Sequence, residues 1–189
     1  MEREIYLDNS ATTRPYDEVI DFIDDINRNF YGNPSSLHTK GIQAEKLMKE
    51  SRDTIARTLG ATRDEVYFTS GGTEANNLAI AGYLYANPRK GKHIITTKIE
   101  HPSVLEVFKH MSEQGYKVDF LDVDSKGLVR IDDLERLINE DTSLISIICV
   151  NNETGVIQPI DEIAAAIKRS GKDIVLHVDA VQAYGKLNI

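Results

Sequence analysis

The sequence predicts an α/β protein with a mostly parallel sheet flanked by helices. From about residue 65 onward, short runs rich in β-branched residues alternate with stretches whose apolar residues recur at helical spacing. This alternation is typical of successive strand–helix units that build a parallel sheet. The 189 residues are 41% hydrophobic, which provides enough apolar material for a core.

Two helices are expected before the first strand–helix unit. They cover about residues 17–28 and about residues 36–59, and the segment Tyr31-Gly32-Asn33-Pro34-Ser35 joins them. Gly60 follows the second helix at the position where glycine commonly ends a helix, because glycine adopts the left-handed conformation at little cost.

The next part of the chain is expected to contain three strands and two helices. The strands cover residues 65–69, 93–97 and 117–121. The first helix covers residues 74–85, and the second begins at about Ser103 and presents its apolar residues on one face.

The last part of the pattern predicts two further helices and two further strands. Residues 131–138 and a segment around residues 163–167 have apolar residues at helical spacing. Residues 143–150 and 174–178 are predicted strands, and the first of them is apolar almost throughout, as in a strand buried on both faces. Residues 184–189 are expected to form a loop that enters another strand, so the fold is expected to be incomplete at its C-terminus.

The chain is expected to form one structural unit. It contains no repeat, no low-complexity run and no linker rich enough in Gly, Pro or Ser to separate two domains. Within this unit, residues 1–30 are expected to form an N-terminal segment and helix, and residues 31–189 to form most of one large domain.

Charge and composition argue against several classes of partner. Thirty acidic residues against 22 basic ones give a net charge of -8, which is unfavourable for binding nucleic acid phosphates or anionic lipid. The N-terminus lacks the apolar core of a signal peptide, and the longest apolar run, residues 144–150, is far shorter than the ~20 residues of a membrane span. We therefore expect a cytoplasmic protein that binds neither nucleic acid nor membrane.

Cysteine and histidine usage predicts neither a disulfide nor a metal site. Cys149 is the single cysteine, and the five histidines are scattered along the chain. Because Cys149 lies in an apolar segment, its thiol is expected to have a raised pKa and to act as a small hydrophobic group.

A glycine-containing turn follows the first predicted strand. Ser70-Gly71-Gly72-Thr73-Glu74 opens a helix, where backbone N–H groups, the helix dipole and the Thr73 hydroxyl attract an anion such as phosphate. A tight turn with Thr73 or Ser70 as the helix cap explains the same residues equally well. The pattern is neither GxGxxG nor a P-loop, which favours a single phosphate group over a dinucleotide or nucleoside triphosphate.

Polar residues also follow three later strands. His101 is placed to stack on a planar ring or to move protons, although a histidine before proline is often structural. Asn152 and Gln182 carry amides that can hydrogen-bond a ligand oxygen, although ordinary turn chemistry explains the Asn152 cluster equally well. Asp179, at the end of an apolar strand, can hold a proton on a cofactor's ring nitrogen. Together with the glycine turn, these groups are expected to converge on one sheet edge.

Six segments of the chain, taken in order, resemble the NifS/IscS-type cysteine desulfurases of the class V aminotransferase superfamily. The segments are Tyr6-Leu7-Asp8-Asn9-Ser10-Ala11-Thr12-Thr13, Gly32-Asn33-Pro34-Ser35-Ser36, Phe68-Thr69-Ser70-Gly71-Gly72-Thr73-Glu74, Glu100-His101, Val150-Asn151-Asn152-Glu153-Thr154-Gly155 and His177-Val178-Asp179-Ala180-Val181-Gln182. The resemblance runs from Ile5 to Ile189 and implies the fold type I architecture with pyridoxal 5′-phosphate (PLP) as cofactor. Residues 31–189 would then be most of the PLP-binding large domain.

The resemblance also implies roles for individual residues. Gly72 and Thr73 would bind the cofactor phosphate, and His101 would stack on the pyridine ring and transfer protons during the reaction. Asp179 would form a salt bridge with the pyridinium nitrogen.

The two amides would lie near the ring oxygen of the cofactor. Gln182 would hydrogen-bond this oxygen, and Asn152 would lie close both to it and to the substrate carboxylate.

The sequence departs from the family pattern in one respect. The family continues to a Ser-x-His-Lys motif whose lysine forms the Schiff base, then to a cysteine that carries the persulfide and an arginine that holds the substrate carboxylate. None of these is present here, and neither Lys98 nor Lys186 aligns with the family's lysine. The chain alone is therefore expected to be inactive.

The resulting hypothesis is the N-terminal part of a PLP-dependent cysteine desulfurase. Such an enzyme converts L-cysteine to L-alanine and transfers sulfur to an acceptor, such as an iron-sulfur scaffold, for iron-sulfur cluster or thio-nucleoside synthesis. A homodimer is expected as the working form, with the loop of residues 32–38 close to the neighbouring subunit. The alternatives are a non-catalytic PLP-binding or partner-pairing module, and another class V activity with a substrate such as selenocysteine, cysteine sulfinate or kynurenine.

Overall fold

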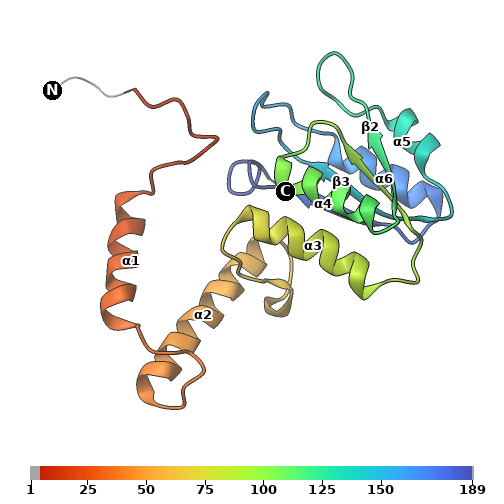
Figure 1. Cartoon of the computed structure of the whole chain (residues 1–189). Helices are drawn as coiled ribbons and strands as arrows, with labels where there is room; N and C mark the ends of the chain where they lie inside the picture. The colour runs from red at the N-terminus through yellow and green to blue at the C-terminus, as the bar shows by residue number, and fades with distance from the viewer. Residues whose placement is uncertain (1–4, 189) are drawn as a thin grey trace. The chain divides into compact units, whose positions relative to one another are not determined.

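The computed structural model describes residues 5–188 (Figure 1). Packing divides the chain into two compact units, Met1–Phe68 and Thr69–Ile189. The boundary between these units, after Phe68, differs from the boundary after residue 30 that the sequence suggests. The large domain expected over residues 31–189 stays a prediction. We describe each unit by itself.

The N-terminal unit consists of two α-helices and one short 3-10 helix. These are α1 (Asp17–Asn29), α2 (Thr39–Thr58) and η1 (Arg63–Glu65). Both α-helices confirm the sequence prediction, but α2 begins three residues later than expected. It begins there because His38 caps the helix, with its ring Nδ1 accepting a hydrogen bond of 3.3 Å from the backbone N–H of Gly41.

The strand predicted over residues 65–69 is wrong. The Glu65 carboxylate accepts hydrogen bonds of 2.7 Å from both the backbone N–H and the hydroxyl of Thr62, and this capping box bends residues 63–65 into η1. Val66 has extended backbone angles, but no strand in the described part of the chain pairs with the segment that follows. An extended segment becomes a strand of a sheet only when a neighbouring strand hydrogen-bonds to its backbone N–H and C=O groups.

The second unit contains a four-stranded parallel sheet with the order β2-β1-β3-β4. The strands are β1 (His93–Thr97), β2 (Lys117–Leu121), β3 (Thr142–Ile148) and β4 (Val175–Asp179). The predicted parallel sheet is therefore confirmed. The strand expected over 143–150 ends earlier, at Ile148, because the chain leaves the sheet and forms the turn after Asn151.

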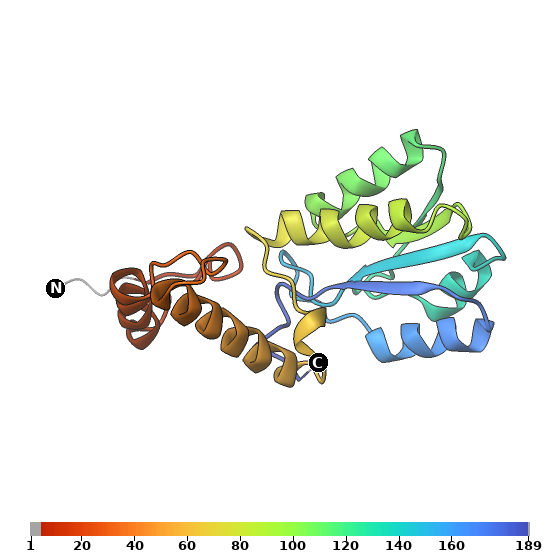
Figure 2. The same cartoon turned by 90° about the horizontal axis from the view of Figure 1, so that it is seen from below.

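Helices cover both faces of this sheet (Figure 2). They are α3 (Gly72–Ala86) and α4 (Pro102–Glu113) on one face, and α5 (Ile131–Leu137) and α6 (Ile160–Ser170) on the other. Each face has its own apolar core: Ile94 of β1 packs with α3 and α4, whereas the next residue, Ile95, packs with α5 and α6. This alternation follows from the two-residue period of a strand and explains why β1 and β3 are buried throughout.

The end of the second unit is a series of turns. Backbone hydrogen bonds from Ala183 and Tyr184 to the carbonyl of Ala180 bend the chain directly after β4. The expected terminal loop is thus present as far as residue 188, and Ile189 lies outside the described residues.

Candidate functional site

The polar residues predicted from the sequence gather at the carboxyl edge of the sheet. Because β1, β3 and β4 run parallel, their last residues lie at the same edge. Contacts between distant segments show how closely they converge. The backbone N–H of Ile148, at the end of β3, donates a hydrogen bond of 3.0 Å to the carboxylate of Glu100, beyond the end of β1. The side chain of Asn76 on α3 donates one of 2.9 Å to Asp179, at the end of β4.

A chain of hydrogen bonds connects His101 with Asp179. The Nδ1 atom of His101 accepts a hydrogen bond of 3.1 Å from the backbone N–H of Ser103 and lies 2.8 Å from the Ser103 hydroxyl. The amide nitrogen of Asn76 donates to the Ser103 hydroxyl at 2.9 Å and to Oδ2 of Asp179 at 2.9 Å. Asn76, Ser103 and Asp179 are each at most 8% exposed. The sequence reasoning missed Asn76 and Ser103, and the one signal for Asn76 was a polar residue one turn into α3.

Asp179 is a buried carboxylate held by neutral donors. Its Oδ2 accepts from Asn76, and its Oδ1 accepts from the backbone N–H of Val181 at 3.1 Å. Within residues 5–188, no Lys or Arg side chain forms an ion pair with it. A buried charge without an opposite charge is unfavourable, so this position favours a cationic group from a ligand.

His177 shares β4 with Asp179 and supplies no such cation. Its Nδ1 lies 2.8 Å from the hydroxyl of Ser146 on β3. Burial lowers the pKa of His177, although the charge of Asp179 opposes the shift. Burial thus favours the neutral form of His177, which supplies no fixed positive charge beside Asp179.

Glu100 is a second buried acid at this edge and is only 5% exposed. Its Oε1 accepts hydrogen bonds from the Thr97 hydroxyl at 2.7 Å and from Ile148, whereas its Oε2 has no hydrogen-bond partner among the described residues. Burial raises the pKa of Glu100 to about 7; the two hydrogen bonds oppose this shift and the charge of Asp179 adds to it. Glu100 is thus close to half protonated near neutral pH.

The glycine turn opens the N-terminus of α3. The carboxylate of Glu74 accepts hydrogen bonds of 2.6 Å from the backbone N–H and the hydroxyl of Ser70, which lowers the pKa of Glu74. The N–H groups at the start of α3, including those of Gly72 and Thr73, have no acceptor within the helix by its geometry. A side chain at Gly72 would begin 3.2 Å from the Val181 side chain, so glycine keeps this end of the helix accessible.

Thr73 and His101 also lie together in space. Both line a hollow of about 400 Å³ between α3 and α4, which continues past Glu106 to His110. The predicted phosphate-binding turn and the predicted ring-stacking histidine therefore border the same space.

The two predicted amides differ in their surroundings. Asn152 is partly buried, and the turn around it is shaped by the preceding residue, Asn151, whose side chain bonds to Ile99 and to Thr154. The side-chain oxygen of Gln182 accepts a hydrogen bond of 3.0 Å from Lys186. The roles of Asn152 and Gln182 in binding a ligand stay predictions.

Cys149 has the buried position and the raised pKa that the sequence predicts, and burial is the cause of the shift. Its backbone N–H donates a hydrogen bond of 2.9 Å to the carbonyl of Asp179, which continues the pairing of the two strands beyond Ile148. Among the described residues no cluster of His, Cys, Asp or Glu has an arrangement that would hold a metal ion. No helix in residues 5–188 is both long and apolar enough to cross a bilayer.

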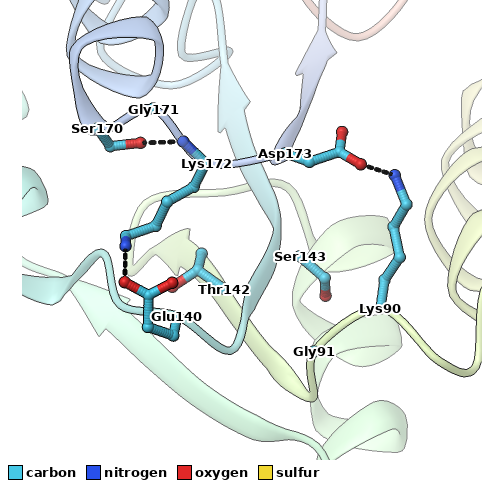
Figure 3. Close-up of a pocket in the computed structure, with 9 residues that line it drawn as sticks. All are labelled: Lys90, Gly91, Glu140, Thr142, Ser143, Ser170, Gly171, Lys172 and Asp173. Atoms are coloured by element: carbon cyan, nitrogen blue, oxygen red, sulfur yellow. Dashed lines mark hydrogen bonds and ion pairs between the residues drawn. The ribbon is translucent and has the colours of Figure 1, made fainter.

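A second hollow, of about 490 Å³, lies at the opposite, amino edge of the sheet (Figure 3). Its lining contains two ion pairs, Lys90 with Asp173 and Lys172 with Glu140, in which the positive and negative charges neutralise each other. It is lined by Lys90, Gly91, Glu140, Thr142, Ser143, Ser170, Gly171, Lys172 and Asp173. None of the predicted site residues is among them, so the carboxyl edge stays the candidate functional site.

Comparison with known proteins identifies the family. The model of the family described as "Aminotransferase class-V" matches residues 5–189. The chain belongs to the class V aminotransferase family. The resemblance inferred from the six sequence segments is thereby confirmed.

Relatives in sequence include cysteine desulfurases. The chain is 47% identical to a cysteine desulfurase of Trichormus azollae, over 97% of this chain and 45% of the relative. It is 44% identical to a cysteine desulfurase IscS of Dictyoglomus turgidum, over 100% of this chain and 48% of the relative. The chain therefore spans about half the length of the curated relatives that it matches.

Solved structures agree with the sequence relatives. A NifS-like protein superimposes with a TM-score of 0.96 at 41% identity, covering 99% of this chain and 51% of that protein. A structure of SspA in complex with cysteine gives a TM-score of 0.91 at 36% identity, covering 97% of this chain and 52% of SspA. The predicted fold, that of the large domain of fold type I PLP enzymes, is confirmed.

Proposed function

We propose that this chain is the N-terminal part of a PLP-dependent cysteine desulfurase, which converts L-cysteine to L-alanine and passes the sulfur to an acceptor. The observation that carries the proposal is the buried Asp179 carboxylate, paired only with neutral donors and connected to His101 at the carboxyl edge of the sheet. The cysteine complex of the related SspA supports cysteine as the substrate.

The chemistry of the donor set fits PLP. Gly72 and Thr73 begin α3, where free N–H groups and the helix dipole favour the cofactor's phosphate. Asp179 supplies the anion for a protonated ring nitrogen, and His101 supplies a flat ring beside it. Asn152 and Gln182 are the amides within the same segments that we assign to the ring oxygen.

When bound, PLP supplies an electron sink for charge that develops on the substrate amino acid. Asp179 keeps the ring nitrogen protonated, because a buried carboxylate stabilises a neighbouring cation more strongly than water does. His101 is held by Ser103 with its Nδ1 as acceptor, so its Nε2 is the atom that holds or moves a proton.

The family resemblance places the remaining catalytic groups beyond residue 189. These are the cofactor-binding lysine, the persulfide cysteine and the arginine for the substrate carboxylate. We therefore propose that the 189 residues alone bind PLP without a covalent bond and produce no alanine. We further propose that the enzyme works as a homodimer in the cytoplasm and passes sulfur to an acceptor protein such as an iron-sulfur scaffold.

The proposed activity is tested by alanine formation from L-cysteine in the full-length protein. Asp179→Asn should reduce kcat at least about 100-fold, because the ring nitrogen loses its counter-charge. Asp122→Asn, which removes an exposed carboxylate paired with Lys98, is the matched control and should leave the rate unchanged. Faster turnover of selenocysteine, cysteine sulfinate or kynurenine than of cysteine would instead assign another class V activity.

Borohydride treatment of the 189-residue chain with PLP separates the proposal from a binding-only module. We expect no covalent PLP adduct on this chain by mass spectrometry, and an adduct on a lysine beyond residue 189 in the full-length protein. Capture at Lys98 or Lys186 would contradict the assignment of the missing lysine to the second half. Absence of capture and of alanine in the full-length protein would support the binding-only module.

A further inference from the structure

Two buried side chains, Asn76 and Ser103, occupy the whole path between His101 and Asp179. Asn76 lies on α3 and Ser103 lies at the start of α4, 27 positions later. Their polar atoms form an unbroken series of contacts between 2.8 and 3.1 Å with the His101 ring and the Asp179 carboxylate. We refer to this pair as the Asn76–Ser103 link.

The direction of each hydrogen bond in the link follows from the chemistry of its ends. An ionised carboxylate can only accept, so Asn76 must turn its NH₂ group toward Asp179. The second N–H of the same group then meets the Ser103 hydroxyl, which acts as its acceptor. The Ser103 hydroxyl is thereby left to donate its own proton to Nδ1 of His101.

The other donor at His101 agrees with this direction. The backbone N–H of Ser103 can only donate, so Nδ1 of His101 must be an acceptor. The neutral ring therefore carries its proton on Nε2. Asp179 accepts from Asn76 and thereby orients it, and the donors Asn76 and Ser103 then specify the tautomer of His101.

We propose that Asn76 and Ser103 are positioning residues that couple the His101 ring to the Asp179 carboxylate. The link acts through these two groups and touches no reacting atom itself. The inference deepens the proposed function, on which it rests for the identity of the ring that His101 and Asp179 contact. A merely structural role for the same residues would hold α3 against α4 without coupling the two groups.

Coupling can be separated from packing because, among residues 5–188, the hydrogen bonds that connect Ser103 with Asp179 pass through Asn76. In the full-length protein, Ser103→Ala should weaken PLP binding by about 2-fold to 10-fold, the effect of one hydrogen bond. The same change made together with Asn76→Leu or with Asp179→Asn should add little, because the link is already broken. Fully additive effects in this double-mutant cycle would overturn the proposal.

A second readout does not depend on PLP. In protein labelled with ¹⁵N-histidine, a ¹⁵N–¹H correlation spectrum should show the His101 proton on Nε2. Ser103→Ala and Asn76→Leu should both move the Nδ1 resonance of His101, whereas Ser103→Thr, which keeps the hydroxyl, should restore it. A proton on Nδ1, or a resonance that ignores Asn76→Leu, would overturn the link.

The control is Ser143→Ala, which removes another buried hydroxyl, at 3.3 Å from the carbonyl of His93 and away from the link. It should change neither PLP binding nor the His101 spectrum. Thermal unfolding of each variant identifies any loss of fold. If the wild-type protein fails to bind PLP while the spectra behave as expected, the proposed function fails and the link stands.

Discussion

Helices α1 and α4 are both amphipathic, yet only α4 is buried. Helix α1 has no buried residue, and its apolar side chains Val19, Ile20, Phe22 and Ile23 are 42–54% exposed. Helix α4 buries five residues against the sheet. The comparison shows that sequence period determines where a helix forms, whereas burial depends on a partner surface elsewhere in the fold.

The two regions also differ in what stabilises them. Helix α1 has exposed local pairs, such as Arg28 with Asp24 at 2.7 Å, which contribute only about 0.3–0.5 kcal/mol each. The sheet unit combines two apolar cores with buried polar groups such as Asp179 and Glu100. Burial raises the pKa of Glu100 to about 7, whereas hydrogen bonds from Thr62 lower the pKa of the exposed Glu65.

The largest expected effect tests this difference in burial directly. Phe108→Ala should lower the free energy of unfolding by about 3–5 kcal/mol, because it leaves a cavity in the core beneath α4. Phe22→Ala on α1, where the ring is 54% exposed, should cost less than about 1 kcal/mol. Urea denaturation of the two variants measures both changes in the free energy of unfolding. Equal losses would contradict the difference in burial between α1 and α4.

The next effect concerns pH. Because the pKa of Glu100 is raised to about 7 in the folded state, its contribution to stability is fully present below about pH 4.5 and is lost as pH rises through 7. Glu100→Gln mimics the neutral acid, so it should gain stability relative to wild type between pH 5 and 8, by about 2–3 kcal/mol. Urea denaturation at several pH values measures the gain, and a pH-independent difference would contradict it.

An acid in the N-terminal unit should respond in the opposite direction. Hydrogen bonds from Thr62 lower the pKa of the exposed Glu65, so its contribution is present above its unfolded pKa and is lost as pH falls. Glu65→Gln should therefore lose stability relative to wild type at pH 7 and match it in acid. A loss that grows toward low pH would show that the Thr62 contacts do not hold the ionised form.

The smallest effect concerns the turn that replaces a predicted strand. Thr62→Ala removes the hydroxyl from the capping box before η1, keeps the backbone N–H contact with Glu65, and should destabilise the N-terminal unit by about 1 kcal/mol. Hydrogen exchange should show the loss confined to residues near η1. Faster exchange throughout the sheet unit would contradict the division into two units.

Sequence patterns predicted the elements whose signal is local. Helix α4 follows from its side-chain period and strand β3 from a short, almost continuous apolar run. The ends of the parallel strands placed His101 and Asp179 at one edge. The segment 65–69 was misjudged because a strand also needs a partner, which no local pattern reveals.

Part of the site could not be predicted from the sequence, because it consists of contacts between residues that are distant along the chain. Asn76 and Asp179 are 103 positions apart, and Asn76 resembles any polar residue of a helix until the fold brings the two side chains together. Ser103 likewise appears as an ordinary residue of the first turn of α4. The missed residues are those whose role exists only in the tertiary structure.

We propose above all that the carboxyl edge of the sheet binds PLP through Asp179. The most direct test is a titration of the 189-residue chain with PLP, in which absorbance reports binding. We predict saturable binding that Asp179→Asn weakens at least about 30-fold, through loss of a buried charge pair, and that Asp122→Asn leaves unchanged. Equal affinity in the wild-type chain and Asp179→Asn, or no saturable binding at all, would contradict the account.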